Sequence, residues 1–227
     1  MVESATTING EIFGKVSISR RKMDLILIHG MGRTPLSMVF LQYRLKQLGH
    51  RPYLFGYSSA FESLNDVTKR LIAFIRQLPS KRYGLIGHSL GTVIIRHALP
   101  LVQSQPTVSF FLAPPIVACK AAKIAARVWP YRILTGDMGQ RLGQDAFMNQ
   151  LTMPDNVKIY IGTAGPRAAW LPLGNEINDG LLTVTEASGD FRQKAITVPA
   201  LHSFIMNSKA VFRDITSDLA LNPTPTP

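Results

Sequence analysis

The sequence Gly-His-Ser-Leu-Gly at residues 87–91 constrains the fold of this chain more than any other feature. Residues 83–86 before it predict a buried strand, and residues 92–99 after it predict a helix. A strand that turns sharply into a helix leaves no space for side chains beside Ser89, which explains the glycine on each side. The motif alone occurs by chance in roughly one chain of this length in ten. Its interpretation therefore depends on the rest of the chain.

A second glycine-rich turn follows another predicted strand. Residues 24–28 form an apolar run typical of a strand covered on both faces in a parallel sheet, and His-Gly-Met-Gly follows at residues 29–32. Further along the chain come Asp179, in an Asn-Asp-Gly turn, and His202. A serine hydroxyl is a weak nucleophile that needs a base, and the base needs an acid to hold one tautomer. The chain offers all three in the order serine, aspartate, histidine.

These motifs resemble the α/β-hydrolase superfamily, and in particular its small lipase-like and esterase-like members. The resemblance extends over residues 24–221 and implies a mostly parallel central sheet flanked by helices, with the site at the carboxyl ends of the strands. It predicts one domain over residues 1–221, a helical cap insertion at residues 114–150 and a disordered tail at residues 222–227. It also implies a serine hydrolase that cleaves carboxylic esters of lipid-like or hydrophobic acyl groups through an acyl-enzyme intermediate.

The resemblance assigns three catalytic residues. Ser89 is the expected nucleophile, His202 the general base and Asp179 the acid that orients it. The Asn-Asp-Gly sequence also makes ordinary turns, so Glu176 and Asp190 remain alternative acids. The same three groups serve a thioesterase or an acyltransferase, and a catalytically silent binding module on this fold is the non-enzymatic alternative.

The two glycine-rich turns supply the remaining expected site residues. The backbone N–H of Leu90 is one expected donor of an oxyanion hole, because Leu90 begins a helix. The resemblance implies that the N–H of Met31, just after the first His-Gly pair, is the second donor, and that His29 orients its turn and does not transfer protons. Supporting positions are His29, Gly30, Gly87, His88 and Gly91.

Aromatic residues in and after the cap are candidates for an acyl pocket. Trp129, Tyr131 and Trp170 line such a pocket if the resemblance holds, and each is equally explicable as ordinary core. The opening part of the cap predicts an amphipathic helix with a basic stripe, formed by Lys120, Lys123 and Arg127. An earlier helix is predicted to begin at Thr34 and Pro35, with an apolar pattern at Leu36, Val39, Phe40, Tyr43 and Leu48.

Composition limits the partners and the chemistry. The chain has 25 Lys and Arg against 14 Asp and Glu, and the resulting charge of +11 favours anionic partners such as a membrane surface. No nucleic-acid-binding motif is present, and nucleic acid is not an expected partner. The single cysteine, Cys119, allows no intrachain disulfide, and no ligand spacing suggests a metal or cofactor. We expect a cytoplasmic protein that can associate with membranes; the oligomeric state stays open.

Overall fold

The structure is a computed structural model that describes residues 22–125 and 129–221. Six strands form one sheet in the order β2-β1-β3-β4-β5-β6, and every neighbouring pair is parallel. This confirms the predicted α/β class. The strands are β1 Asp24–Ile28, β2 Arg51–Phe55, β3 Tyr83–His88, β4 Val108–Leu112, β5 Val157–Gly162 and β6 Ala195–Val198.

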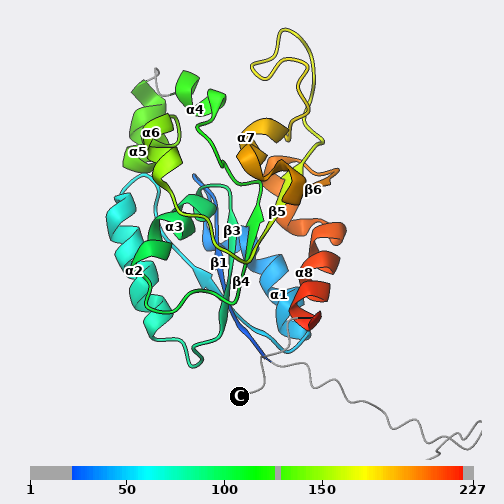
Figure 1. The fold of residues 1–227 in the computed structure, drawn as a ribbon. Helices are drawn as coiled ribbons and strands as arrows, with labels where there is room; N and C mark the ends of the chain where they lie inside the picture. The colour runs from blue at the N-terminus through cyan, green and yellow to red at the C-terminus, as the bar shows by residue number, and fades with distance from the viewer. Residues whose placement is uncertain (1–21, 126–128, 222–227) are drawn as a thin grey trace, which may run out of the picture.

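Helices cover both faces of the sheet (Figure 1). α2 Leu64–Arg76 and α3 Leu90–Ala98 lie on one face, and α1 Val39–Gln47 and α8 Lys209–Leu221 lie on the other. The described chain also contains the short helix α7 Val184–Ser188 and four 3-10 segments: η1 Pro35–Met38, η2 Leu99–Leu101, η3 Gly189–Lys194 and η4 His202–Asn207.

The two hydrophobic cores follow from the alternation of side chains along the strands. In β1 all five residues are buried; Ile26 and Ile28 face the core under α2 and α3, and Leu25 and Leu27 face the core under α1 and α8. A strand in which four of the five residues are apolar and all five are buried is stable only where helices cover both faces. The central strands β1, β3 and β4 therefore form a rigid support for the turns at their carboxyl ends.

The segment between β4 and β5 carries α4 Lys120–Ala125, α5 Trp129–Arg141 and α6 Asp145–Gln150, beyond the carboxyl end of the sheet (Figure 1). It corresponds to the predicted cap at residues 114–150, and its role as a cap stays a prediction. Arg127 and the predicted tail at residues 222–227 lie outside the described residues. None of the described helices is both long and apolar enough to cross a bilayer.

The helical segment after β1 begins where it was predicted, with Thr34 as the N-cap and Pro35 as the first residue, but the predicted apolar pattern is not its buried face. The segment begins as the 3-10 turn η1 and continues as α1, and Thr34 makes no capping bond through its side chain. The buried residues are Met38, Leu41 and Leu45, whereas the predicted pattern lies largely in solvent, at Leu36, Val39, Phe40 and Tyr43. Apolar residues occupy both faces of this segment, so periodicity could not choose between them, and the tighter initial turn changes the phase of the helix.

Candidate active site

Ser89 lies at the turn between β3 and α3 in a strained backbone conformation. Its φ of 50° and ψ of −118° are unusual for a residue with a side chain. The surrounding backbone holds it there, because the Ser89 N–H donates to the carbonyl of Leu112 at 2.9 Å and its own carbonyl accepts from the N–H of Thr92 at 2.9 Å. This is the geometry that the Gly-x-Ser-x-Gly sequence predicted.

The glycines around Ser89 are required by close contacts. A Cβ at Gly91 would lie 2.4 Å from the carbonyl oxygen of Ile28, and a Cβ at Gly87 would lie 2.9 Å from the backbone nitrogen of Thr92. A Cβ at Gly30 would lie 3.2 Å from the Cβ of Ser89. The turn at residues 29–32 therefore lies directly against the turn at Ser89, and a side chain at any of these glycines would push the two strand ends apart.

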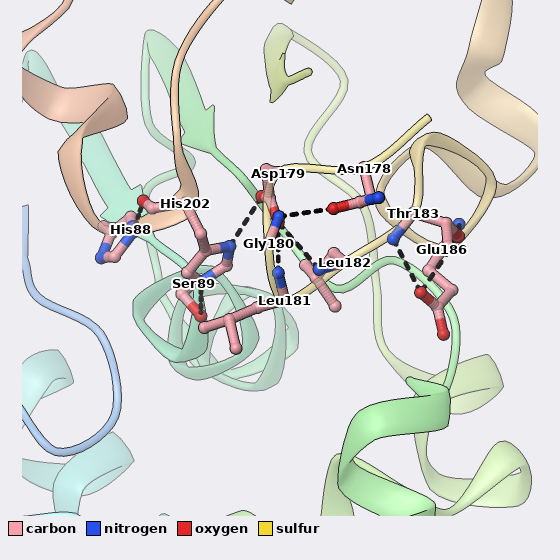
Figure 2. A network of polar contacts seen from close by, with 10 residues as sticks. All are labelled: His88, Ser89, Asn178, Asp179, Gly180, Leu181, Leu182, Thr183, Glu186 and His202. Carbon is pink, nitrogen blue, oxygen red and sulfur yellow. Dashed lines mark hydrogen bonds and ion pairs between the residues drawn. The ribbon is translucent and has the colours of Figure 1, made fainter. Parts of the chain in front are cut away.

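Ser89, His202 and Asp179 form a hydrogen-bonded line (Figure 2). His202 Nε2 lies 2.9 Å from Ser89 Oγ, and His202 Nδ1 lies 2.7 Å from Asp179 Oδ2. A carboxylate only accepts, so Nδ1 carries the proton and Nε2 is left to accept the serine hydroxyl. The structure thus brings together three groups that the sequence separates by up to 113 positions. This arrangement can activate the serine as a nucleophile.

A set of backbone contacts fixes the carboxylate of Asp179. Its second oxygen, Oδ1, accepts from the N–H groups of Leu181 at 2.9 Å and Leu182 at 2.8 Å. The N–H of His202 donates to the Asp179 carbonyl at 2.8 Å, so the acid and the base are also joined through the main chain. The buried Asn178 amide holds the same turn, because it accepts from the N–H of Gly180 and donates to two carbonyls.

The alternative acids lie elsewhere. Glu176 forms an ion pair with Lys120 at 2.5 Å, and both side chains are about half exposed. Asp190 lies in η3. Only Asp179 has a carboxylate oxygen in hydrogen-bond contact with His202 among the described residues.

His88 holds the backbone of His202 in place through a hydrogen bond. Its Nε2 donates to the backbone carbonyl of His202 at 2.9 Å, and the two imidazole centroids are 5.1 Å apart (Figure 2). Burial, and secondarily the neighbouring imidazole of His202, lowers the pKa of His88 to about 3. His88 is therefore a neutral donor at ordinary pH. It links the strand that carries Ser89 to the segment that carries His202.

His29 is the first residue of the glycine-rich turn at residues 29–32. Its Nδ1 donates to the carbonyl of Gly30 at 2.9 Å, and its ring stacks on Tyr57 with the centroids 4.3 Å apart. The Tyr57 hydroxyl donates to the His29 carbonyl at 2.8 Å. Burial lowers the pKa of His29, which favours the uncharged ring. These contacts shape the turn and do not include His202.

A pocket of about 200 Å³ opens beside Ser89, and its wall is almost wholly apolar. Met31 belongs to this wall. Leu90 is the first residue of α3, where backbone N–H groups find no acceptor within the helix. The lining residues are Met31, Ser89, Pro115, Cys119, Ala121, Ala122, Leu142, Leu181, Leu182 and His202.

The aromatic candidates do not make up this pocket as far as the structure describes them. Trp170 lies on the loop between β5 and α7 with 84% of its surface exposed, and it is not among the lining residues. The side chains of Trp129 and Tyr131 lie outside the described part of the structure. Cys119 is buried and lines the pocket. Burial raises the pKa of its thiol to about 11, so it remains protonated.

Glu186 joins the two walls of the pocket. One carboxylate oxygen accepts from the N–H of Lys120 at 2.6 Å, at the start of α4. The other accepts from the N–H and the hydroxyl of Thr183, on the segment that follows Asp179 (Figure 2). No role for Glu186 was predicted from the sequence, although Thr-x-x-Glu at residues 183–186 is the signature of a capping box, which the structure contains.

Arg96 connects α3 to both ends of the segment between β4 and β5. This α3 side chain is buried, and its guanidinium donates to four backbone carbonyls at 3.1 to 3.2 Å. Two carbonyls, of Pro115 and Ile116, lie at the beginning of that segment, and two, of Met148 and Leu151, lie at its end. Burial lowers the pKa of Arg96 to about 10, which leaves it charged. In the sequence, Arg96 is a single arginine within an apolar helix, and this pattern does not predict which groups the arginine contacts.

No described group of three or more His, Cys, Asp or Glu side chains is arranged to hold a metal ion. The hydrogen-bonded line at Ser89 uses only amino-acid side chains and backbone groups.

Comparison with known proteins gives structural matches only. No protein-family model and no curated protein matches the chain. Among solved structures, Bacillus licheniformis lipase BlEst2 in its propeptide form has a TM-score of 0.66 and 17% identity over 91% of this chain and 52% of its own length. This chain therefore spans about half of that lipase.

Two further structures are covered almost completely. The ydeN gene product from B. subtilis has a TM-score of 0.60 and 14% identity, over 86% of this chain and 98% of its own length. The hydrolase olei00960 from Oleispira antarctica has a TM-score of 0.58 and 12% identity, over 89% and 92%. Together with the all-parallel sheet, these matches establish that the protein has the α/β-hydrolase fold, as its motifs predicted.

Proposed function

We propose that the protein is a serine hydrolase that cleaves carboxylic esters with apolar acyl groups through an acyl-enzyme intermediate. One observation carries the proposal: the hydrogen-bonded line from Ser89 through His202 to Asp179 ends at an apolar pocket. A buried carboxylate, an imidazole in a fixed tautomer and a strained serine together meet the requirements of acyl transfer.

In the first half of the reaction, Ser89 Oγ attacks the carbonyl carbon of the ester while His202 Nε2 takes the hydroxyl proton. Asp179 stabilises the imidazolium that forms. The negative charge on the carbonyl oxygen is held by the N–H groups of Met31 and Leu90, and the positive end of α3 adds to this stabilisation. The bond to the alcohol oxygen then breaks, and His202 returns its proton to the departing alcohol.

In the second half, water replaces the alcohol. His202 removes a proton from the water, the resulting hydroxide attacks the acyl-enzyme carbonyl, and the bond to Ser89 Oγ breaks as the proton returns to the serine. The products are a carboxylic acid and a regenerated enzyme. Thioester cleavage and acyl transfer use the same groups and remain alternatives, and the experiment below separates thioester cleavage from ester cleavage.

The pocket supports an acyl group of moderate size. An engineered apolar cavity of about 150 Å³ holds benzene, so a pocket of about 200 Å³ suits a chain of about eight carbons. The B. licheniformis neighbour is named a lipase, which agrees with an apolar substrate. We therefore expect esters of medium-length fatty acids to be the preferred class.

The test is hydrolysis of p-nitrophenyl esters from acetate to palmitate by the wild type and by Ser89→Ala, with acyl-CoA thioesters in parallel. The proposal predicts turnover that the variant loses and that peaks near the octanoate ester. Labelling by a fluorophosphonate should require Ser89. Faster turnover of thioesters would assign a thioesterase, and a lack of both labelling and turnover would leave a silent module on the hydrolase fold.

A further inference from the structure

One face of the continuous segment η1 and α1 is apolar and exposed. Leu36 is 72% exposed, Phe40 51% and Tyr43 60%, and Val39 lies between them. We call these four residues the α1 stripe. The opposite face of the same segment is buried through Met38, Leu41 and Leu45, so the helix cannot rotate to cover the stripe without exposing the core. Contiguous exposed apolar residues of this kind mark interaction surfaces.

The α1 stripe begins next to the candidate active site. Met31 lines the pocket, and η1 begins at Pro35, only a few residues later. On the other side, η4 contacts α1 and carries both His202 and Phe204, whose side chain is 58% exposed. The stripe therefore begins only a few residues after Met31 of the pocket wall, and α1 contacts the element that carries His202.

The surroundings of the stripe are basic. Residues 25–61 contain no aspartate or glutamate. Three cations belong to the segment of the stripe, Arg33, Arg44 and Lys46, and the adjacent helix α8 adds Lys209 and Arg213. None of these five forms an ion pair with any residue that the structure describes.

Arg44 connects α1 to α8. Its guanidinium lies 3.4 Å from the ring centroid of Phe212 and 5.5 Å from that of Phe40. Burial and the nearby charge of Arg213 both lower the pKa of Arg44. Two guanidinium groups therefore lie close together on the side of the molecule that carries the apolar stripe, and neither has a carboxylate partner among the described residues.

The predicted basic stripe on the cap is different. Lys120 forms an ion pair with Glu176, and Lys123 forms one with Asp145 at 2.8 Å. The third member, Arg127, lies outside the described residues. The described charges of that stripe are thus compensated within the protein, whereas the five cations around α1 have no ion-pair partner in the part of the chain that the structure describes.

We propose that the α1 stripe and its five cations form a docking surface for an anionic lipid bilayer. Aromatic and aliphatic side chains enter the interface, and the negative surface potential of anionic lipid attracts each nearby Lys or Arg. Docking there places the pocket beside the bilayer surface. That last consequence, delivery of membrane-borne acyl groups to Ser89, rests on the proposed function.

The test is vesicle flotation with the full chain carrying Ser89→Ala, which makes binding independent of hydrolysis. Vesicles of phosphatidylcholine alone are compared with vesicles that also contain phosphatidylglycerol. We expect binding to the anionic vesicles only, weakened by added salt. Adding Phe40→Ser with Tyr43→Ser, or Arg44→Gln with Arg213→Gln, should each lower the bound fraction about tenfold.

Matched controls use exposed residues elsewhere. Phe61→Ser removes a side chain that is 93% exposed on the loop between β2 and α2, and Lys120→Gln with Lys123→Gln removes two paired cations. Both should bind like the parent, with unchanged melting temperatures. Equal loss in these controls, or no binding to either vesicle, would overturn the proposal. A dimer in light scattering that Phe40→Ser with Tyr43→Ser dissociates would assign the stripe to a second copy instead.

Failure of this proposal is distinguishable from failure of the proposed function. Turnover of soluble p-nitrophenyl esters by the stripe variants, with Ser89 intact, should equal that of the wild type. Loss of vesicle binding with full soluble turnover separates the docking surface from the reaction centre.

Discussion

The candidate active site and the segment between β4 and β5 are built in different ways. Around Ser89, backbone meets backbone: a Cβ on Gly91 would lie 2.4 Å from a carbonyl of β1, and the strained serine is held by main-chain hydrogen bonds. The segment at residues 114–150 packs apolar side chains into the core, and two buried charged side chains, Arg96 of α3 and Glu186 of α7, anchor its backbone. Its main-chain bonds to α7 are those of the Ile116 and Val117 N–H groups to the carbonyl of Glu186.

This difference indicates which property depends on each region. Close contacts among the strand ends leave the backbone almost no room to move, so the candidate active site is as rigid as the core. Side-chain anchors can be loosened without moving the sheet, so damage to them should alter the pocket before it alters the chemistry. Changes in the first region should lower kcat or the stability of the whole fold, and changes in the second should raise KM for long acyl chains.

The largest expected effect is on the acid. Asp179→Asn keeps the size of the side chain but favours the wrong tautomer of His202, so kcat should fall by about 10⁴-fold. Glu176→Gln is the matched control, because Glu176 contacts Lys120 at the surface. Steady-state hydrolysis of a short p-nitrophenyl ester measures both. A normal rate in Asp179→Asn would transfer the role to another carboxylate.

Gly91→Ala should destabilise the fold through overpacking. The new Cβ would meet the carbonyls of Ile28 and His29, which belong to backbone and cannot swing away, so the free energy of unfolding should fall by roughly 3 kcal/mol or more. Urea unfolding followed by circular dichroism measures this loss. Gly143→Ala is the control, since its Cβ would have no contact shorter than 3.3 Å. Equal stability of the two variants would contradict the close contact at the elbow.

Arg96→Met should act mainly on the pocket. It removes hydrogen bonds to four carbonyls at both ends of the segment and should cost about 2 kcal/mol of unfolding free energy. We expect KM for the octanoate ester to rise about tenfold, with kcat for the acetate ester nearly unchanged. Arg141→Gln, which breaks an exposed ion pair, should change neither. A selective loss of kcat would show that the two regions are not separable.

The smallest expected effect is the pH dependence that His88 contributes. Because burial lowers its pKa from 6.5 to about 3, the unfolded chain binds a proton in this range that the folded protein does not. Stability should therefore fall as the pH drops below 6.5, by at most about 1.4 kcal/mol per pH unit. His88→Gln should have the shallower slope in urea unfolding between pH 7 and pH 5. Identical slopes would contradict the buried neutral imidazole.

The parts of the site that lie in short motifs were predictable from sequence. The strained turn at Ser89 and the first glycine-rich turn each follow from a few adjacent residues whose spacing allows one local geometry. His202 and Asp179 were predicted through the resemblance and the chain order, and the structure brings both to Ser89. Their separation along the chain meant that no local pattern could establish the contact.

The pocket and the exposed face of α1 were not predictable in the same way. Trp170 matched the composition of a pocket wall, yet it lies in solvent, and the wall is formed by smaller residues such as Cys119 and Ala122. In α1, apolar residues on both sides of the helix made two orientations equally consistent with the sequence. Only contact with the sheet and with η4 selects one.

The parallel α/β architecture and the turn at Ser89 follow from local sequence, because buried strands and glycine-flanked turns depend on residues close together in the chain. Three outcomes depend on how the chain packs: which carboxylate contacts His202, which side chains line the pocket and which face of α1 stays exposed. These outcomes depend on long-range contacts, such as those of Arg96 and Glu186, whose energies exist only once distant segments are packed together.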